Sequence, residues 1–431
     1  MARQRVTDHQ SFFSHSRRKT WARYQRRHLR CCHDSQMSTR TELDLTDATA
    51  FVRHDAHEFW REVRKSKPVY WHAGDPGFWV VARHADVLSC YANVKVLSSA
   101  RGTVLDVLLR GGDSAGGKML AVTDRPRHRE LRNLMSRAFS PRVLGEVEHN
   151  VRRRATRLIR TVTQLDEFDF ATEVAEHIPM NTICDLLSIP QEDRKQLLQW
   201  NKLALSSDDA EADELDSLEA RNEIVGYFMD LARQRRRAPD DDVISLIATA
   251  EAGDRRLTLE EVALNCYSLI LGGDESSRVS AICAVKTLAE HPDQWRALRD
   301  GSADPDSAVE EVLRWATPAM HFARTATGDT EIGGHRVRAG DIVTLWNTSA
   351  NNDEEVFAAP RRFDLTRSPN KHVSFGHGPH FCVGAFLGRM ELRALLSALT
   401  QSVTEIRVCG TPTPIYSNFL HGYSSLPVAF R

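Results

Sequence analysis

Phe375-Gly-His-Gly378-Pro-His-Phe-Cys382-Val-Gly384 is the stretch that decides the fold of this 431-residue chain. Gly378 and Gly384 lack a Cβ, so the backbone can turn sharply and approach a flat ligand closely. The apolar run that begins at Ala385 has helical character, which places the Cys382 sulfur near a helix N-terminus. Unpaired N–H groups and the helix dipole favour an anion there and predict a lowered thiol pKa. The alternative is a buried cysteine beside a glycine turn.

The spacing Phe-x-x-Gly-x-x-x-Cys-x-Gly resembles the heme-binding loop of the cytochrome P450 family. The resemblance extends from about residue 50 to the C-terminus. It implies that Cys382 is the axial ligand of the iron in heme b, with Phe375, Gly378 and Gly384 beside the cofactor. It also implies a mainly α-helical fold with small antiparallel β-sheets, in which heme lies between a long central helix and the helix that follows the cysteine loop.

Glu311-Val-Leu-Arg314 places opposite charges three residues apart on one face of a predicted helix. Such pairs are common on solvated helices and mean little alone. The P450 family, however, has an E-x-x-R motif at a similar distance before its cysteine. It completes the motif with an arginine from a P-x-R-F segment, here Pro360-Arg-Arg362-Phe363. The resemblance implies a buried structural network of Glu311, Arg314 and Arg362 that holds the cysteine loop in place.

A long helix is predicted in the middle of the chain. Thr258-Leu-Glu-Glu261 is a capping box, and the apolar pattern after it runs to Pro292. Gly272 and Gly273 lie near its centre, where each glycine costs about 1 kcal/mol relative to alanine. Close helix packing would explain the pair. Together with the cysteine loop, the pair favours a helix face turned toward heme, O₂ or substrate.

Glu275 and Ser276 follow the glycine pair and resemble the family's acid–alcohol pair, which relays protons during oxygen activation. Serine stands where threonine is usual, so the hydroxyl is kept while its rotamer is less restrained. These two residues are the predicted catalytic groups. Their retention argues against a peroxide-driven peroxygenase, and a non-catalytic heme sensor would not need them.

Four side chains match propionate-binding positions of the family. His128 and Arg132 are spaced i, i+4 on a predicted helix, Arg324 follows the break at Pro318, and His372 precedes the cysteine loop. Buried propionates require cations or hydrogen-bond donors. Each of these residues alone would be interpreted as a surface residue, whereas the set predicts heme contacts.

Strand-like patterns lie near both ends of the chain, at residues 69–72, 78–82 and 322–346, and the pattern between residues 84 and 300 is largely helical. The glycine-rich stretch 101–118 is expected to be a mobile loop over the pocket, although an ordinary surface loop would have the same composition.

Composition excludes several classes of protein. Lys and Arg number 57 against 58 Asp and Glu, so no nucleic-acid partner is expected. Eight cysteines are scattered without a C-x-x-C pair, which favours a reducing, cytoplasmic location. No run of about 18 apolar residues occurs, so no membrane span is predicted.

The N-terminal stretch differs from the rest. Residues 1–36 carry nine Lys and Arg against two Asp. They are expected to be a disordered extension or sequence upstream of the true start, and the alternative is a basic arm that contacts anionic surfaces. Residues 37–431 are expected to form a single catalytic domain, and the protein is expected to be a monomer.

The resemblance implies a heme-thiolate monooxygenase that inserts one oxygen atom of O₂ into a C–H bond of a hydrophobic small molecule. The loop Gly378-Pro-His-Phe-Cys382 and the absence of a membrane anchor resemble enzymes of natural-product biosynthesis, which implies a tailoring step with the substrate free or bound to a carrier protein. Epoxidation, oxidative coupling, a peroxygenase and a heme sensor are the alternatives. Electrons from NAD(P)H would arrive through a ferredoxin and its reductase. The side chains predicted to line the substrate pocket are Leu105, Leu108, Met320, His321, Phe322, Phe419 and Leu420.

Overall fold

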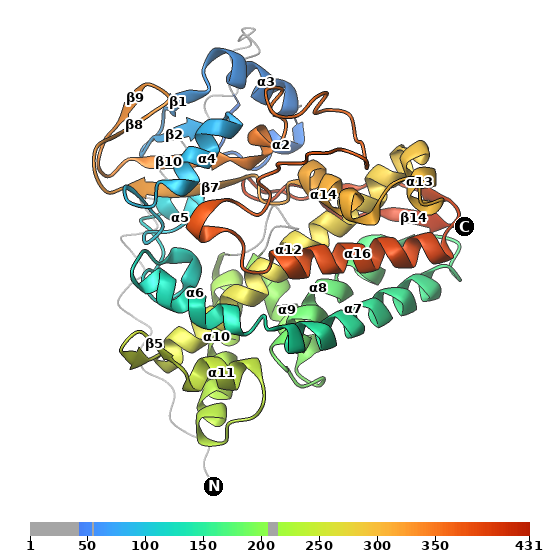
Figure 1. The fold of residues 1–431 in the computed structure, drawn as a ribbon, viewed down its shortest axis with the longest axis horizontal. Coiled ribbons are helices and arrows are strands. Elements are labelled where there is room, and N and C mark those ends of the chain that lie inside the picture. Colours follow the sequence, from blue (N-terminus) through green and yellow to red (C-terminus); the bar gives the residue numbers. More distant parts are fainter. Residues whose placement is uncertain (1–42, 54–55, 206–213) are drawn as a thin grey trace, which may run out of the picture. The chain divides into compact units, whose positions relative to one another are not determined.

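The helix predicted in the middle of the chain is α12 (Leu259–Glu290). The structure is a computed structural model that describes residues 43–53, 56–205 and 214–431, and α12 crosses its helical part diagonally (Figure 1). Thr258 Oγ1 accepts a hydrogen bond from the Glu261 N–H at 3.1 Å, and the Glu261 carboxylate accepts one from the Thr258 N–H at 2.7 Å. The predicted capping box is therefore confirmed. The prediction for residues 1–36 lies outside the described residues.

Helices surround α12 and bury their apolar faces against it. Val262, Ile270 and Ile282 of α12 are completely buried in this core. The helix α7 (Pro141–Val162) packs on α8 and α16 from the outer side. The helices in contact with α12 are α8 (His177–Leu186), α9 (Arg194–Leu205), α10 (Glu214–Arg237), α11 (Val243–Thr249), α13 (Pro292–Arg299), α14 (Pro305–Ala316) and α16 (Ala385–Ser402).

The largest sheet combines strands from the two ends of the chain in the order β1-β2-β10-β7-β3. The predicted hairpin of β1 and β2 is antiparallel, with Val69 opposite Val81. β2 and β10 run parallel, so this sheet is mixed rather than purely antiparallel. Parallel neighbours need a long crossover, and the helical part of the chain provides it. The strands are β1 (Val69–His72), β2 (Phe78–Val81), β3 (Leu97–Ser98), β7 (His321–Ala326) and β10 (Ile342–Trp346).

Four smaller sheets are antiparallel. Gly333 and Gly334, with φ of 55° and 81°, make the turn of one of them. Residues Leu43–Arg431 form one compact unit, and the mainly α-helical fold with small sheets is confirmed. The strands are β4 (Phe168–Asp169), β5 (Glu251–Ala252), β6 (Arg255–Arg256), β8 (Thr330–Ile332), β9 (His335–Val337), β11 (Ile406–Val408), β12 (Thr413–Pro414), β13 (Tyr423–Ser425) and β14 (Pro427–Phe430).

The stretch 101–118 is less irregular than its glycine content suggests, because it contains the short helix α5 (Leu105–Leu109). Glycines with φ above +100° stand on both sides of this helix and turn the chain. The remaining helices are α2 (Ala50–Arg53), α3 (Ala56–Ser66), α4 (His84–Ala92), α6 (Arg127–Arg137), α15 (Asn347–Ala350) and the short turns η1 (Leu120–Val122), η2 (Ala171–Ala175) and η3 (Gly378–His380).

Candidate functional site

The loop that carries Cys382 ends at the N-terminus of α16 and is closed by backbone hydrogen bonds. The Cys382 N–H donates to the Phe375 carbonyl at 2.9 Å, and the Phe381 N–H donates to the Gly378 carbonyl at 3.0 Å. Gly378 has φ of +69°, and a Cβ there would lie 3.0 Å from the Tyr91 carbonyl oxygen of α4. The left-handed backbone and the close approach together require glycine at this position.

The Cys382 side chain is accessible. Desolvation by the surrounding loop nevertheless raises the pKa of its thiol, although the backbone N–H of Gly384 and the guanidinium groups of Arg132 and Arg389 act in the opposite direction. The helix N-terminus and the two guanidinium groups therefore do not by themselves produce the predicted lowering of the thiol pKa. A bound metal cation would supply the missing charge, since thiolate ligands lose their proton on binding.

A cluster of nitrogen-bearing side chains from three separate segments lies near this loop. His128 on α6 and His380 in the cysteine loop have ring centroids 4.0 Å apart. Burial and the positive charges of Arg324 and Arg132 lower the pKa of His380 to about 3, and burial with Arg132 lowers the pKa of His128 to about 4. Both imidazoles are therefore neutral near pH 7 beside two guanidinium groups, which suits an anionic group.

Two observations fit the propionates of heme, the cofactor that the family resemblance implies. His128 is 2% exposed, and its Nε2 has no hydrogen-bond partner within the described residues. Arg324 is 3% exposed, donates to the Ala323 carbonyl at 2.8 Å and lies over the Tyr91 ring. Buried groups of this kind require a partner of opposite polarity. The predicted contacts of His128, Arg132 and Arg324 remain proposals that this geometry supports.

His372 does not take part in this cluster as predicted. Its Nε2 lies 3.1 Å from Glu310 Oε2, and its Nδ1 accepts a hydrogen bond from the Ser374 N–H at 3.2 Å. Both ring nitrogens therefore have protein partners. The histidine beside His128 is His380, which the sequence analysis overlooked although it stands only two residues before Cys382.

We expect His380→Ala to weaken heme retention. Loss of a hydrogen bond to a charged group costs about 1.5–3 kcal/mol, which corresponds to roughly tenfold or more in affinity. Transfer of heme to an acceptor apoprotein would measure the change. His377→Ala, at an exposed histidine of the same loop, is the matched control and should leave the transfer rate unchanged. Equal rates for the two variants would contradict a propionate contact of His380.

The glycine pair of α12 serves two purposes. A Cβ on Gly273 would lie 2.6 Å from the Ile183 side chain of α8, so Gly273 permits close helix packing. No atom lies within 4 Å of a Cβ built on Gly272, and this glycine is exposed. Helix packing therefore explains Gly273, while Gly272 leaves an open helix face beside Ser276, one turn later.

The predicted acid and alcohol differ in their surroundings. Ser276 is half-buried, and its hydroxyl donates to the Gly272 carbonyl at 2.9 Å. The buried carboxylate of Glu275 forms a bidentate ion pair with Arg278 of the same helix, with Arg278 Nε 3.1 Å from Glu275 Oε2. The hydroxyl thus lies on the Gly272 side of the helix, whereas the carboxylate is held by a guanidinium group.

Glu311 and Arg314 on α14 form a completely buried, bidentate pair, with both nitrogen–oxygen distances at 2.8 Å. The arginine that joins them is Arg367, whose Nε lies 3.1 Å from Glu311 Oε2. The prediction that Arg362 is the third member of the network is wrong, because the Arg362 side chain is exposed. Arg362 takes part through its backbone carbonyl, which accepts a hydrogen bond from Arg367. The local P-x-R-F pattern could not show which arginine the loop turns inward.

The ion pair is connected to the cysteine loop through one asparagine. Arg314 donates to the Asn351 carbonyl at 2.9 Å. The Asn351 side-chain amide donates to Ser374 Oγ at 2.9 Å, and its oxygen accepts from the Val373 N–H at 2.7 Å. Val373 and Ser374 begin the turn that leads to Cys382. The network therefore fixes the start of the loop, as expected for a structural rather than chemical role.

Most of the predicted pocket side chains fill core instead. Leu105, Leu108 and Met320 are less than 5% exposed and share an apolar cluster with Trp60 and Trp346. Their role as pocket residues stays a prediction that this packing does not support, because α5 and the residue before β7 pack inward onto the sheet.

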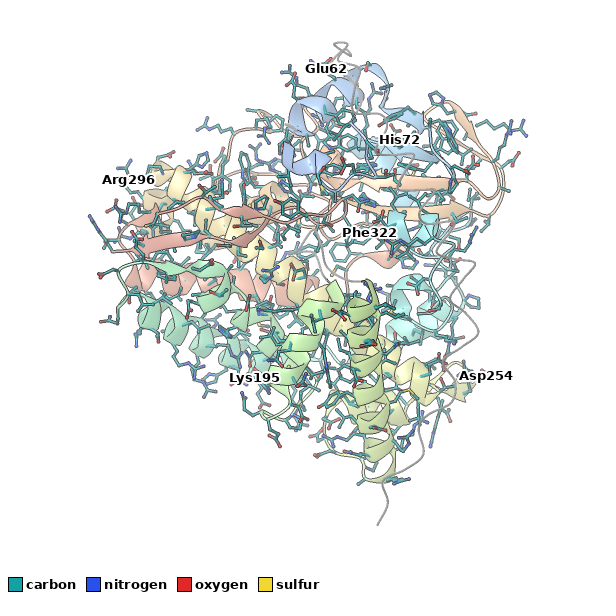
Figure 2. The ribbon with its side chains drawn as sticks, turned by 180° about the vertical axis from the view of Figure 1, so that it is seen from behind. Glu62, His72, Lys195, Asp254, Arg296 and Phe322 are labelled. Atoms are coloured by element: carbon teal, nitrogen blue, oxygen red, sulfur yellow. The ribbon has the colours of Figure 1, made fainter. Side chains whose placement is uncertain are left out.

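The other predicted pocket residues lie around the start of β7. His321 is completely buried, with its ring centroid 4.6 Å from that of Trp346, and Leu420 packs on Val279. Phe322 and Phe419 are only partly buried, and their ring centroids lie 5.7 Å apart. Figure 2 shows Phe322 where the sheet meets the helical part. Phe322 and Phe419 remain the pocket candidates from the predicted set.

Comparison with known proteins gives consistent matches. The family model described as Cytochrome P450 matches residues 306–404, which include α14 and the cysteine loop. The chain is 43% identical to Cytochrome P450 NovI of Streptomyces niveus over 90% of this chain and 96% of that protein. It is 32% identical to Steroid C26-monooxygenase of Mycolicibacterium smegmatis, over 89% of this chain and 92% of that protein.

Solved structures agree with these matches. The crystal structure of P450 OxyD, described as involved in the biosynthesis of vancomycin-type antibiotics, aligns with a TM-score of 0.82 and 34% identity. The alignment covers 90% of this chain and 99% of OxyD. The sequence comparison and the structure comparison therefore both match P450 proteins over nearly their whole lengths.

Proposed function

The chain is a member of the cytochrome P450 family, and on that premise we propose that it hydroxylates a hydrophobic small molecule in a tailoring step of natural-product biosynthesis. It is a P450 monooxygenase with a heme-iron cofactor, and electrons derived from NAD(P)H reach it through redox partners. The observation that carries the tailoring proposal is the full-length similarity to OxyD, whose description names antibiotic biosynthesis.

Heme bound through a thiolate supplies the oxygen-activating chemistry and the insertion into a C–H bond. The residues proposed to hold it are Cys382 on the iron and His128, Arg132, Arg324 and His380 at the propionates. The protein excludes water, orients the substrate and moves protons.

Ser276 is the proposed proton-handling alcohol on the open face of α12. Its hydroxyl donates to the Gly272 carbonyl, which leaves its oxygen lone pairs available to accept from a water molecule. Glu275 would exchange protons with solvent when its carboxylate leaves the bidentate contact with Arg278. The pair would thus act in sequence, with Ser276 holding the water and Glu275 renewing its proton.

We expect Ser276→Ala to bind heme and accept electrons normally while forming less product per NAD(P)H consumed, with hydrogen peroxide as the other product. The ratio of product to NAD(P)H consumed measures this directly. Ser276→Thr restores a hydroxyl and should keep the ratio comparable. Ser277→Ala removes the neighbouring hydroxyl and is the matched control. An unchanged ratio in Ser276→Ala would assign the side chain to packing.

Identification of the substrate requires a binding screen. Hydrophobic natural-product precursors, both free and attached to a carrier protein, would be added to the heme-loaded chain while the Soret band is recorded. We expect one chemical class to shift the band and to stimulate NAD(P)H oxidation. A shift without stimulated oxidation would favour a heme sensor instead, and stimulation by free compounds alone would exclude the carrier-bound form.

We further propose a ferredoxin and its reductase as the redox partners, docking on the cysteine side. Phe381 and Phe386 flank Cys382 and are 38% and 48% exposed. Arg389 and Arg393 follow on α16, where they pair with Glu310 and Asp306. Exposed aromatic groups beside arginines are typical of protein-binding surfaces.

No helix within the described part of the chain is long and apolar enough to cross a membrane.

A further inference from the structure

Asp274 on α12 and Asn201 on α9 form a buried polar contact between two helices. Asp274 stands between the glycine pair and Glu275, and it is 3% exposed, while Asn201 is completely buried. Asn201 Nδ2 donates to Asp274 Oδ2 at 2.5 Å. This contact lies in the segment of α12 that carries Ser276, and the proposed mechanism does not use it.

The contact leaves one oxygen on each partner unsatisfied. Asp274 Oδ1 and Asn201 Oδ1 are both buried, and neither has a hydrogen-bond partner among the residues that the structure describes. Two acceptors cannot satisfy each other, and a buried carboxylate with an empty acceptor is costly. A proton on the carboxyl group turns one of its oxygens into a donor. The acceptor available to this donor is the unsatisfied amide oxygen of Asn201.

The surroundings of Asp274 also favour the protonated form of its carboxyl group. Burial raises the pKa of its carboxyl to about 8, the neighbouring Glu275 adds to the rise, and Arg278 opposes it. Arg278 is already held in the bidentate pair with Glu275. Glu391 on α16 also raises this pKa, and Cys184 is the titratable group that faces Asp274 from α8. Arg278, the basic group that acts on Asp274, is thus shared with the carboxylate of Glu275.

We propose that Asp274 is a positioning residue that keeps its proton at neutral pH and, through a reciprocal pair of hydrogen bonds with Asn201, fixes α9 against the glycine segment of α12. A neutral Asp274 does not compete with Glu275 for Arg278. The proton-handling role of the neighbouring residues rests on the proposed function. The protonation of Asp274 does not depend on that role.

The pair is sensitive to alkaline pH. Loss of the proton places a second negative charge beside Glu275, where the two carboxylates compete for Arg278. The hydrogen bond from Asp274 to the Asn201 oxygen is lost in the same step, and the Asn201 side chain keeps one hydrogen bond to Asp274 instead of two. Because α9 packs on α12, the loss of this bond weakens the packing of α9 against the segment of α12 that carries Gly272.

The sign of the stability effect follows from the direction of the pKa shift. The folded pKa of Asp274 lies above its ordinary value of 3.8. The contribution of Asp274 to stability is therefore complete below that value, declines as pH rises and is gone above about 8. Asp274→Asn cannot titrate, so its melting temperature should fall less between about pH 6 and pH 9 than that of the unsubstituted protein.

Infrared difference spectra of the heme-loaded full chain test the protonation directly. The unsubstituted protein should lose the C=O stretch of a protonated carboxyl as pH rises through about 8. Asp274→Asn should lack that change. Glu391→Gln is the matched control, because burial also raises the pKa of Glu391, to about 7. It should keep the Asp274 band and lose a different carboxyl band.

A second variant covers the case in which Asp274→Asn does not fold. Asn201→Ala removes the partner, so the carboxyl band should remain but move in frequency as its hydrogen bond is lost. An identical titrating band in the unsubstituted protein and Asp274→Asn would overturn the proposal, as would an unmoved band in Asn201→Ala. If the bands behave as expected but the Ser276→Ala coupling experiment fails, the pair is real and only its link to proton delivery is wrong.

Discussion

Glu311→Ala is expected to yield little heme-bound protein. Removal of the carboxylate leaves Arg314 and Arg367 as uncompensated buried charges, which costs on the order of 3–5 kcal/mol. That is a large share of the stability of an ordinary domain. The ratio of heme to protein after purification and the melting temperature of the remaining holoprotein measure the effect.

Asp306→Ala is the matched control for this variant. Asp306 lies on the same helix, α14, and pairs with Arg393 at the surface, where its side chain is 67% exposed. Exposed pairs of this kind contribute between 0 and about 1 kcal/mol. Heme content and melting temperature should therefore stay close to those of the unsubstituted protein. Normal heme content in Glu311→Ala would show that the network does not hold the cysteine loop.

Cys382→Ser is expected to abolish substrate-dependent NAD(P)H oxidation and to weaken heme binding. A serine hydroxyl is a poor ligand for iron and cannot supply the electron donation of a thiolate. Turnover, heme content and the absorption spectrum of the reduced protein with CO would all change together. The substitution is small and lies in a loop with an accessible side chain, so the fold should be retained.

Cys409→Ser is the control for the cysteine substitution. Cys409 follows β11, is partly exposed and lies outside the loop. Its replacement should change neither spectrum nor turnover. Retention of the thiolate spectrum in Cys382→Ser would require another cysteine to bind iron, and it would contradict the assignment.

Local sequence patterns predicted two features that depend on neighbours along the chain. The capping box at Thr258 and the ion pair of Glu311 with Arg314 each have the geometry that their pattern predicts. The helix N-terminus at Cys382 is equally local, but it does not lower the thiol pKa. The cytochrome P450 resemblance added the order of these elements, and the comparisons confirm it.

Features that depend on tertiary packing could not be predicted in this way. Whether Arg362 or Arg367 turns toward Glu311 depends on how a loop folds over α14. His380 meets His128 only because the cysteine loop approaches α6. The inward packing of Leu105 on α5 likewise follows from the sheet beneath it. None of these contacts has a periodic signature in the sequence.

The neutral pair of Asp274 and Asn201 belongs to the same class. Both residues are ordinary polar positions on predicted helices, and their contact appears only when α9 crosses α12. Buried polar groups with unsatisfied atoms are rare in folded proteins, so each is a reason to examine its protonation state.

The absorption spectrum of the reduced, CO-bound full-length protein tests the central claim, that Cys382 holds heme iron as a thiolate. We predict the red-shifted Soret band that distinguishes thiolate-ligated heme from histidine-ligated heme, and we predict its loss in Cys382→His. A Soret band at the position of a histidine complex in the unsubstituted protein, or a thiolate band that persists in Cys382→His, would contradict the account.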